Sequence, residues 1–230
     1  MAGKCDNRAA NPLDLAGRVG HMREVMTELK TICVYCGSNA GRAQDYTEAA
    51  ITLGREIAAA GAGLVYGGGS IGLMGIVARS AMEAGAPVTG VIPGFLRDRE
   101  VMLKEVTELI VTDDMHDRKQ AMFDRADAFV TLPGGIGTLE EVIEVATWAQ
   151  LDQHAKPIVM VNTAGFWNPL KDQFRRMAHD GFLAKEFLGE HVALPLEFVD
   201  RAEDAVPRVR ELLAAVAPED LEKPDGVELM

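Results

Sequence analysis

The stretch DAFVTLPGGIGTLEE, residues 127–141, joins an apolar run to three glycines and a threonine, and two glutamates follow after one leucine. The run at 127–133 predicts a buried strand, and the glycines predict a tight loop that opens a helix. Backbone N–H groups in such a loop can converge on an anion, and the positive end of the helix dipole favours negative charge there. Glu140 and Glu141 would repel that anion, so their position beside the loop needs a separate explanation.

Similar apolar runs recur along the chain at 31–36, 63–68, 88–93, 106–112 and 157–162. Amphipathic segments such as 43–60 separate them. Most of these runs are continuously apolar, which is typical of strands that are buried on both faces. The alternation of strand and helix predicts an α/β fold: a single Rossmann-like doubly wound domain, in which a central parallel sheet has helices on both faces.

Glycine-rich loops follow three of the predicted strands, at 37–41, 67–72 and 133–137. In open parallel sheets, ligands bind at the carboxyl ends of the strands. We therefore expect the three loops to meet at one edge of the sheet. We expect substrate contacts from Gly37 and Ser38 in the first loop and from Gly68 and Gly69 in the second.

The length of 230 residues suits one domain, which we place at 29–216. Segment 1–28 has weak periodicity and segment 217–230 is acidic, so both are interpreted as loosely ordered extensions. The net charge of −12, without a basic tract, argues against a nucleic-acid polymer as partner. No apolar run approaches the roughly 20 residues of a membrane span, and the N-terminus lacks the apolar centre of a signal peptide. We therefore expect no membrane partner and a cytoplasmic location.

The cysteine pair Cys33 and Cys36 has the C-x-x-C spacing of redox sites. A redox pair needs its first thiolate at a helix N-terminus, which lowers the pKa of that thiol. Here both cysteines lie in or at the end of a predicted strand, where positions three apart face opposite sides. We therefore interpret them as structural core residues.

The segment GGGSIG, residues 67–72, matches the glycine spacing of the dinucleotide-binding fingerprint after a strand and before a helix. The complete fingerprint also needs an acidic residue about 20 positions further on, at the end of the next strand. That strand ends in VIPGF, which contains no carboxylate. An NAD site is therefore not expected, whereas contact of this loop with a phosphate or ribose stays open.

Two explanations of Glu141 stay open at this point. Thr138 and Glu141 have the spacing of a capping box, in which the glutamate reaches back to the start of its own helix. Alternatively, Arg118 and Lys119 follow another predicted strand at the same sheet edge, and a glycine cradle, an arginine and a glutamate would form an anion site with a carboxylate beside it. Arg118 also fits a solvated charge on a helix surface. The anion site suits a substrate with a phosphate at one end and an electron-poor carbon at the other.

These motifs, in this order, resemble the LOG (Lonely Guy) family, cytokinin riboside 5'-monophosphate phosphoribohydrolases that are often mislabelled as lysine decarboxylases. The resemblance runs from about Thr31 to about Gly181 and includes CVYCGSNAG, LVYGGGSIGLMG, GVIPGFL, DMHDRKQAM and KPIVMVN. Its most specific element is P-G-G-x-G-T-x-x-E at 133–141, together with the upstream Arg-Lys pair. Ile136 departs from the plant members, which commonly carry an aromatic residue there.

The resemblance implies that Arg118 and Glu141 form a catalytic pair. It implies substrate contacts from Glu100, Lys119, Gly134, Gly135, Ile136, Gly137, Thr138, Leu139, Glu140 and Thr147. The implied reaction is hydrolysis of the N-glycosidic bond of an N6-modified adenosine monophosphate, without metal or cofactor, by a homo-oligomer of at least two chains. The glutamate beside the anion loop then has a role, because a carboxylate stabilises the oxocarbenium-like sugar carbon or activates the attacking water.

Two rivals belong to other functional classes. Molybdenum-cofactor carrier proteins look similar in fold and in glycine loops, and they hold a phosphorylated pterin without hydrolysing it. A pyridoxal-phosphate decarboxylase needs a Schiff-base lysine, usually within a much larger fold. Lysines such as Lys156 and Lys171 have no such context in this sequence. The presence of both Arg118 and Glu141 favours the enzyme over the carrier.

Overall fold

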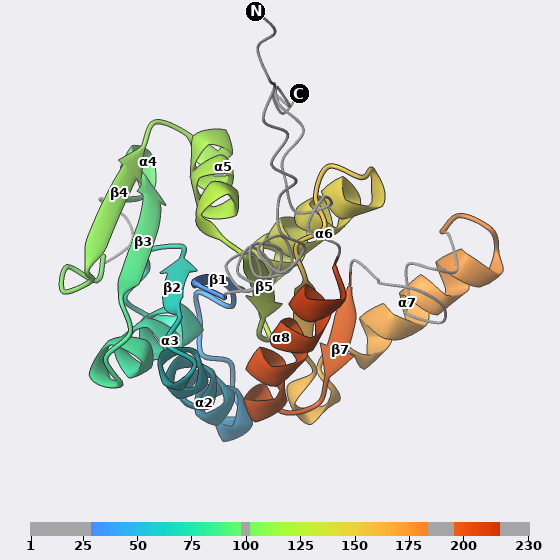
Figure 1. Ribbon diagram of the computed structural model, residues 1–230, viewed down its shortest axis with the longest axis horizontal. Coiled ribbons are helices and arrows are strands. Elements are labelled where there is room, and N and C mark those ends of the chain that lie inside the picture. The colour runs from blue at the N-terminus through green and yellow to red at the C-terminus, as the bar shows by residue number, and fades with distance from the viewer. Residues whose placement is uncertain (1–28, 98–101, 184–195, 217–230) are drawn as a thin grey trace, which may run out of the picture.

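A computed structural model describes residues 29–97, 102–183 and 196–216. Its centre is a sheet of seven strands in the order β4-β3-β2-β1-β5-β6-β7, in which every pairing is parallel (Figure 1). The strands are β1 (Thr31–Tyr35), β2 (Gly63–Tyr66), β3 (Val88–Pro93), β4 (Glu108–Thr112), β5 (Ala128–Thr131), β6 (Ile158–Val161) and β7 (Glu197–Val199).

The topology confirms the doubly wound prediction. From β1 the chain adds β2, β3 and β4 outward on one side, then returns to the other side of β1 and adds β5, β6 and β7. The direction therefore switches between β1 and β5, and in such sheets the ligand crevice lies at the switch point. All six predicted runs contain strands. The short and only partly buried β7 was missed, because three residues carry too little pattern.

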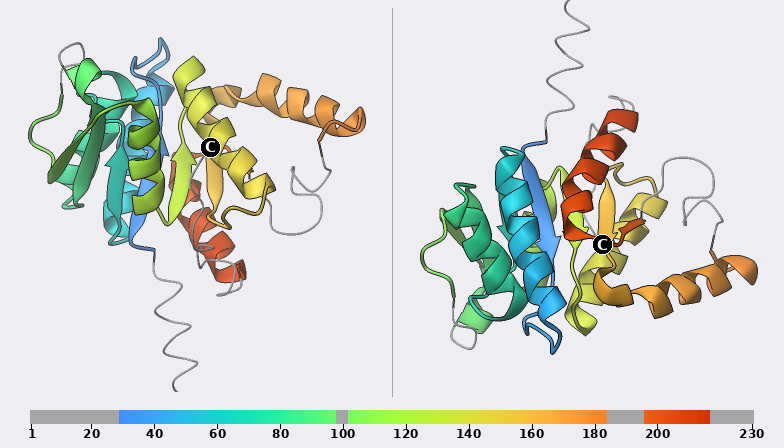
Figure 2. Two further views of the ribbon diagram at one scale, coloured as in Figure 1. Left: turned by 90° about the horizontal axis from the view of Figure 1, so that it is seen from above. Right: turned by 90° about the horizontal axis from the view of Figure 1, so that it is seen from below.

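The helices form two layers, one on each face of the sheet (Figure 2). Helices α2, α3 and α8 cover one face, whereas α5 and α6 cover the other and α7 extends past the edge of the sheet. Their bounds are α2 (Gln44–Ala59), α3 (Gly72–Glu83), α4 (Gly94–Arg97), α5 (Met115–Arg125), α6 (Ile136–Gln150), α7 (Asn168–His179) and α8 (Ala205–Ala215). None of the helices in the described ranges is long and apolar enough to cross a membrane.

Each face of the sheet has its own apolar core. Cys36 packs in the core beneath α2 and α3, whereas Cys33 packs in the core beneath α5 and α6. Burial raises the pKa of both thiols far above its ordinary value. The two cysteines are therefore inert core residues on opposite faces, as their spacing on a strand predicted.

Candidate functional site

The three glycine loops meet where the chain direction switches. The N–H of Gly37, after β1, donates to the carbonyl of Pro133, after β5, at 3.1 Å. The N–H of Leu73, after the second loop, donates to the carbonyl of Gly37 at 3.0 Å. Gly72 has a φ of 61°, and a Cβ there would collide with the carbonyl of Ser38. Glycine is therefore needed for the loops to pack this closely, and their predicted convergence is confirmed.

The N-terminus of α6 is open to a ligand. Its N-cap is Gly135, with extended backbone, and no side chain caps it. Gly134 is packed against the side chain of Thr138, whereas a Cβ on Gly135 or Gly137 would meet no atom within 4 Å. Ile136, the first helical residue, is 84% exposed. A helix start without a side-chain cap, at the positive end of the helix dipole, is the kind of position that favours an anion.

Arg118 and Glu141 form a buried ion pair next to this helix start. Nη1 of Arg118, in α5, donates to Oε1 of Glu141, in α6, at 2.9 Å, and each side chain is only 7% exposed. Nε of Arg118 donates to the carbonyl of Val91, in β3, at 3.2 Å. Arg118 is therefore fixed between the two helices and the sheet. It is not the solvated surface charge that its position on a helix also allowed.

Glu141 does not cap its own helix. It lies six residues, about 9 Å along the helix axis, beyond the N-cap Gly135, and its carboxylate pairs with Arg118 instead. Burial raises the pKa of Glu141, and the charge and hydrogen bond of Arg118 oppose that shift. A carboxyl group whose ionisation depends on one partner is typical of sites that do chemistry.

Glu140 takes part in a second contact between α5 and α6. Nζ of Lys119 lies 2.7 Å from Oε1 of Glu140 and 2.8 Å from Oε1 of Glu144. The lysine is mostly buried, whereas Glu140 is half exposed. The two consecutive glutamates thus pair with the two consecutive basic residues, Arg118 with Glu141 and Lys119 with Glu140. A pattern of charges along the chain does not reveal this pairing, because 21 residues separate Lys119 from Glu140 and 23 separate Arg118 from Glu141.

The other predicted site residues are spread over the same sheet edge and α6. Ser38 is exposed, whereas Gly68 and Gly69 are buried. The carbonyl of Gly68 accepts from Leu103, and Gly69 forms an antiparallel bridge with Met102. Leu139 packs partly against the core. The Thr147 hydroxyl donates to the carbonyl of Ile143, one turn earlier in α6. Glu100 lies outside the described residues.

Sequence patterns did not point to the carbonyl of Val91. A backbone acceptor leaves no trace in residue types, and no signal in the chain could have found it. Among the described residues, no group of three or more His, Cys, Asp or Glu side chains is placed to hold a metal ion.

Comparison with known proteins identifies relatives along most of the chain. The family model described as "Possible lysine decarboxylase" matches residues 74–209. Cytokinin riboside 5'-monophosphate phosphoribohydrolase LOG1 of Arabidopsis thaliana is 44% identical over 187 residues, which cover 80% of this chain and 88% of LOG1. LOG7 of the same plant is 40% identical over 88% of this chain and 94% of its own length. The rice enzyme LOG is 45% identical over 80% of this chain and 77% of its own length.

Among solved structures, the molybdenum cofactor carrier protein of Chlamydomonas reinhardtii has a similar fold. One structure of it has a TM-score of 0.61 at 26% identity, covering 82% of this chain and 99% of the carrier. The molybdenum cofactor binding protein of Rippkaea orientalis has a TM-score of 0.60 at 19% identity, covering 80% of this chain and 98% of that protein. At this level of identity, the second likeness shows the fold alone.

Proposed function

This chain belongs to the LOG family of cytokinin riboside 5'-monophosphate phosphoribohydrolases, and we propose that it hydrolyses the N-glycosidic bond of an N6-modified adenosine 5'-monophosphate, or of AMP. The products are the free base and ribose 5-phosphate. The observation that carries the proposal is the buried Arg118–Glu141 pair, with 2.9 Å between Nη1 and Oε1, beside the open N-terminus of α6.

The two parts of the site suit the two ends of the substrate. The 5'-phosphate binds at the glycine loop, where N–H groups of the first turn of α6 and the helix dipole attract it. Glu141 faces the ribose, where the sugar carbon becomes positively charged as the bond to the base breaks. Water supplies the hydroxyl that replaces the base at this carbon, and the departing base takes up a proton.

Glu141 must be ionised, whether it stabilises this positive charge or removes the proton from the attacking water. Burial favours the neutral acid, and Arg118 favours the carboxylate. Arg118 therefore keeps the buried carboxyl in the form that the reaction needs.

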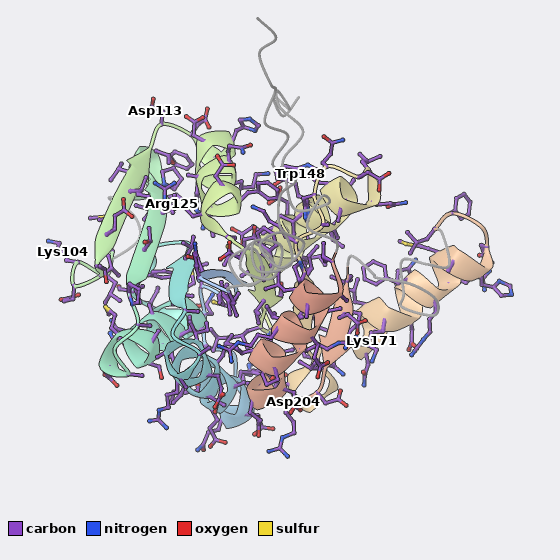
Figure 3. The ribbon with its side chains drawn as sticks, in the orientation of Figure 1. Lys104, Asp113, Arg125, Trp148, Lys171 and Asp204 are labelled. Carbon is purple, nitrogen blue, oxygen red and sulfur yellow. The ribbon has the colours of Figure 1, made fainter. Side chains whose placement is uncertain are left out.

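The matching family model is described as a possible lysine decarboxylase, but the surroundings of Lys156 and Lys171 give little support for a Schiff-base lysine. Nζ of Lys156 donates to the carbonyl of Phe123 at 2.7 Å and lies 4.0 Å from the centroid of the Phe123 ring. Lys171 lies over the ring of Phe198. Figure 3 shows Lys171 on α7, on the far side of α6 from α5. Both amines are thus engaged in contacts with aromatic residues.

Product analysis tests the proposed reaction. The purified full-length chain is incubated with isopentenyladenosine monophosphate or AMP, without added metal or cofactor, and the products are separated by chromatography. We expect free base and ribose 5-phosphate in equal amounts. Tight binding of a nucleotide or pterin without any cleavage would favour the carrier function. Visible absorbance from pyridoxal phosphate in the purified protein would favour the decarboxylase.

We also propose that the protein is a homodimer or larger assembly. Leu151, at the end of α6, is 62% exposed, and Phe182, just after α7, is 87% exposed. Contiguous apolar patches mark surfaces that bind a partner, and a dimer is the assembly that the family resemblance implies. Trp148, which Figure 3 shows on α6, does not belong to this surface, because it packs edge to face on Phe123 within the chain, with ring centroids 5.1 Å apart. Light scattering at micromolar concentration should find a dimer or larger species, and a monomer alone would contradict this.

A further inference from the structure

Gly67 lies at the end of β2, and its missing side chain leaves the space that one nitrogen of Arg118 occupies. A Cβ built on Gly67 would overlap Nη2 of Arg118, and it would lie 3.3 Å from Cζ of the same guanidinium. The other nearby atom is Cε of Met74 at 3.4 Å, which is an acceptable contact for a flexible side chain. The only serious collision is therefore with the guanidinium.

The backbone of Gly67 does not itself require glycine. Its φ is not in the left-handed region, in contrast to its neighbour Gly68, which has a φ of 77°. An alanine at 67 could therefore adopt the same backbone conformation without strain. The reason for glycine at this position is the space needed by Arg118.

The guanidinium is held at three points. Nη1 bonds to Glu141, Nε bonds to the carbonyl of Val91, and Nη2 lies against Gly67. The planar, rigid head of arginine cannot move one nitrogen without moving the others. A side chain at 67 that displaces Nη2 must therefore disturb the bond between Nη1 and Glu141.

We propose that Gly67 is a positioning residue for the hydrolysis: its lack of a side chain sets the location of the Arg118 guanidinium and, through it, the charge state and orientation of Glu141. This inference rests on the proposed function for its kinetic consequences, and on the geometry alone for its effect on Glu141. It gives GGGSIG a role other than dinucleotide binding. The first glycine of the motif accommodates an arginine from α5 instead of a pyrophosphate.

The kinetic experiment compares Gly67→Ala with Gly94→Ala, in the full chain. Gly94, after β3, is a matched control, because a Cβ there would meet only ordinary contacts at 3.7 and 3.9 Å and its φ is not positive. We expect Gly67→Ala to lower kcat at least tenfold and to lower the unfolding midpoint while unfolding stays cooperative, because the buried Arg118–Glu141 contact is weakened. Gly94→Ala should retain both activity and midpoint. The acid limb of the kcat/KM profile should move to higher pH in Gly67→Ala, because a weaker contact with Arg118 raises the pKa of Glu141.

A double-mutant cycle separates this role from direct contact with the substrate. Lysine has no Nη2, so Gly67→Ala should cause little further loss when it is added to Arg118→Lys. Independent, multiplying losses in the double variant would overturn the proposal, because Gly67 would then act on the substrate or on the fold.

A measurement without substrate keeps the inference separate from the proposed reaction. The carboxyl carbon of Glu141 is titrated by ¹³C NMR in the wild type, Gly67→Ala and Gly94→Ala. An upward shift of the Glu141 pKa in Gly67→Ala alone supports the positioning role, even if the wild type hydrolyses no nucleotide. An unchanged Glu141 titration in Gly67→Ala would overturn it, even if the enzyme is active.

Discussion

Glu141 accepts a hydrogen bond at 2.9 Å from Arg118, a residue of the neighbouring helix, while both side chains are almost completely buried. A buried charge is costly unless a partner and hydrogen bonds compensate it. The pair lies beside the open helix N-terminus that we propose for the phosphate. This relationship explains why a glutamate stands so close to an anion site: the arginine beside it holds its charge in place and partly neutralises it.

Glu141→Gln should remove most turnover and preserve the fold. The amide keeps the size of the side chain but has no negative charge to stabilise a sugar cation or accept a proton. We expect kcat to fall by roughly 10²–10⁴-fold, the usual range for the loss of a general acid or base. Steady-state kinetics and thermal unfolding measure the two properties, with the exposed Glu83→Gln as control. Wild-type turnover in Glu141→Gln would exclude the catalytic role.

Arg118→Met should destabilise the protein in a pH-dependent way. Removing one partner of a buried pair typically costs about 3–5 kcal/mol. Without the arginine, burial raises the pKa of Glu141 further, so the folded state prefers the protonated acid. The loss of stability should therefore be smallest at acidic pH and grow as the pH rises through the folded pKa. Urea unfolding across this range is the measurement. The control is Arg175→Met, which removes one partner of the exposed Arg175–Asp172 ion pair. This substitution should lower the free energy of unfolding by at most about 1 kcal/mol at any pH.

His154 should make the protein less stable in mild acid. Its Nδ1 accepts from the N–H of Lys156 at 3.0 Å, and its Nε2 lies 2.8 Å from the carbonyl of Val145, so the ring fits as the neutral form. Burial, followed by the charge of Lys156, lowers the pKa of His154 from 6.5 to about 4. The contribution of neutral His154 to the free energy of unfolding is therefore complete above pH 6.5 and is lost as the pH falls toward 4.

The size of this loss follows from the shift in the His154 pKa, which corresponds to about 3 kcal/mol. Unfolding free energies measured between pH 7 and pH 4 should fall less steeply in His154→Gln than in the wild type. His179→Gln, at an exposed position, is the control for the substitution itself. Equal slopes in all three proteins would show that another group causes the acid sensitivity.

The two glycines at the start of α6 should respond differently to alanine. A Cβ on Gly134 would collide with the side chain of Thr138, whereas a Cβ on Gly135 would point into open space. Gly134→Ala should therefore lower stability, while Gly135→Ala should cost at most about 1 kcal/mol. Gly135→Ala should still weaken monophosphate hydrolysis, because the methyl group blocks the approach of the phosphate to the backbone.

The comparison that checks this prediction is kcat/KM for a cytokinin riboside monophosphate and for the matching riboside. We expect a large preference for the monophosphate in the wild type and a smaller one in Gly135→Ala. Contacts of this kind contribute about 1.5–3 kcal/mol each, and they appear in kcat as well as KM when they align the sugar. An equal preference in both proteins would mean that Gly135 serves only the turn.

Some expectations from the sequence stay predictions. The cytoplasmic location, the domain limits at 29 and 216 and the contribution of Glu100 rest on residue patterns or on the family resemblance alone. The individual roles of Thr147, Gly68 and Gly69 have the same standing.

Residue patterns alone predict the parallel sheet, its helices and the edge at which the glycine loops gather. Continuous apolar runs such as 157–162 are typical of strands that are buried on both faces, and loops that follow parallel strands meet at one edge of the sheet. These predictions combine local residue patterns with a general rule of parallel sheets, so they do not need the three-dimensional structure. The motif at 133–141, together with the other motifs quoted above, also indicated the family.

The roles of the charged residues depend instead on contacts between helices that are far apart in the chain. The sequence left two roles open for Glu141, a helix cap or a site residue, and two for Arg118, a surface charge or a site residue. Helical spacing describes one helix at a time, so it could not distinguish these roles. Folding places α5 beside α6, buries both groups together and brings Gly67 and the Val91 carbonyl against the guanidinium. The cost of an uncompensated charge in the core then leaves one arrangement, in which each charge is held by its partner.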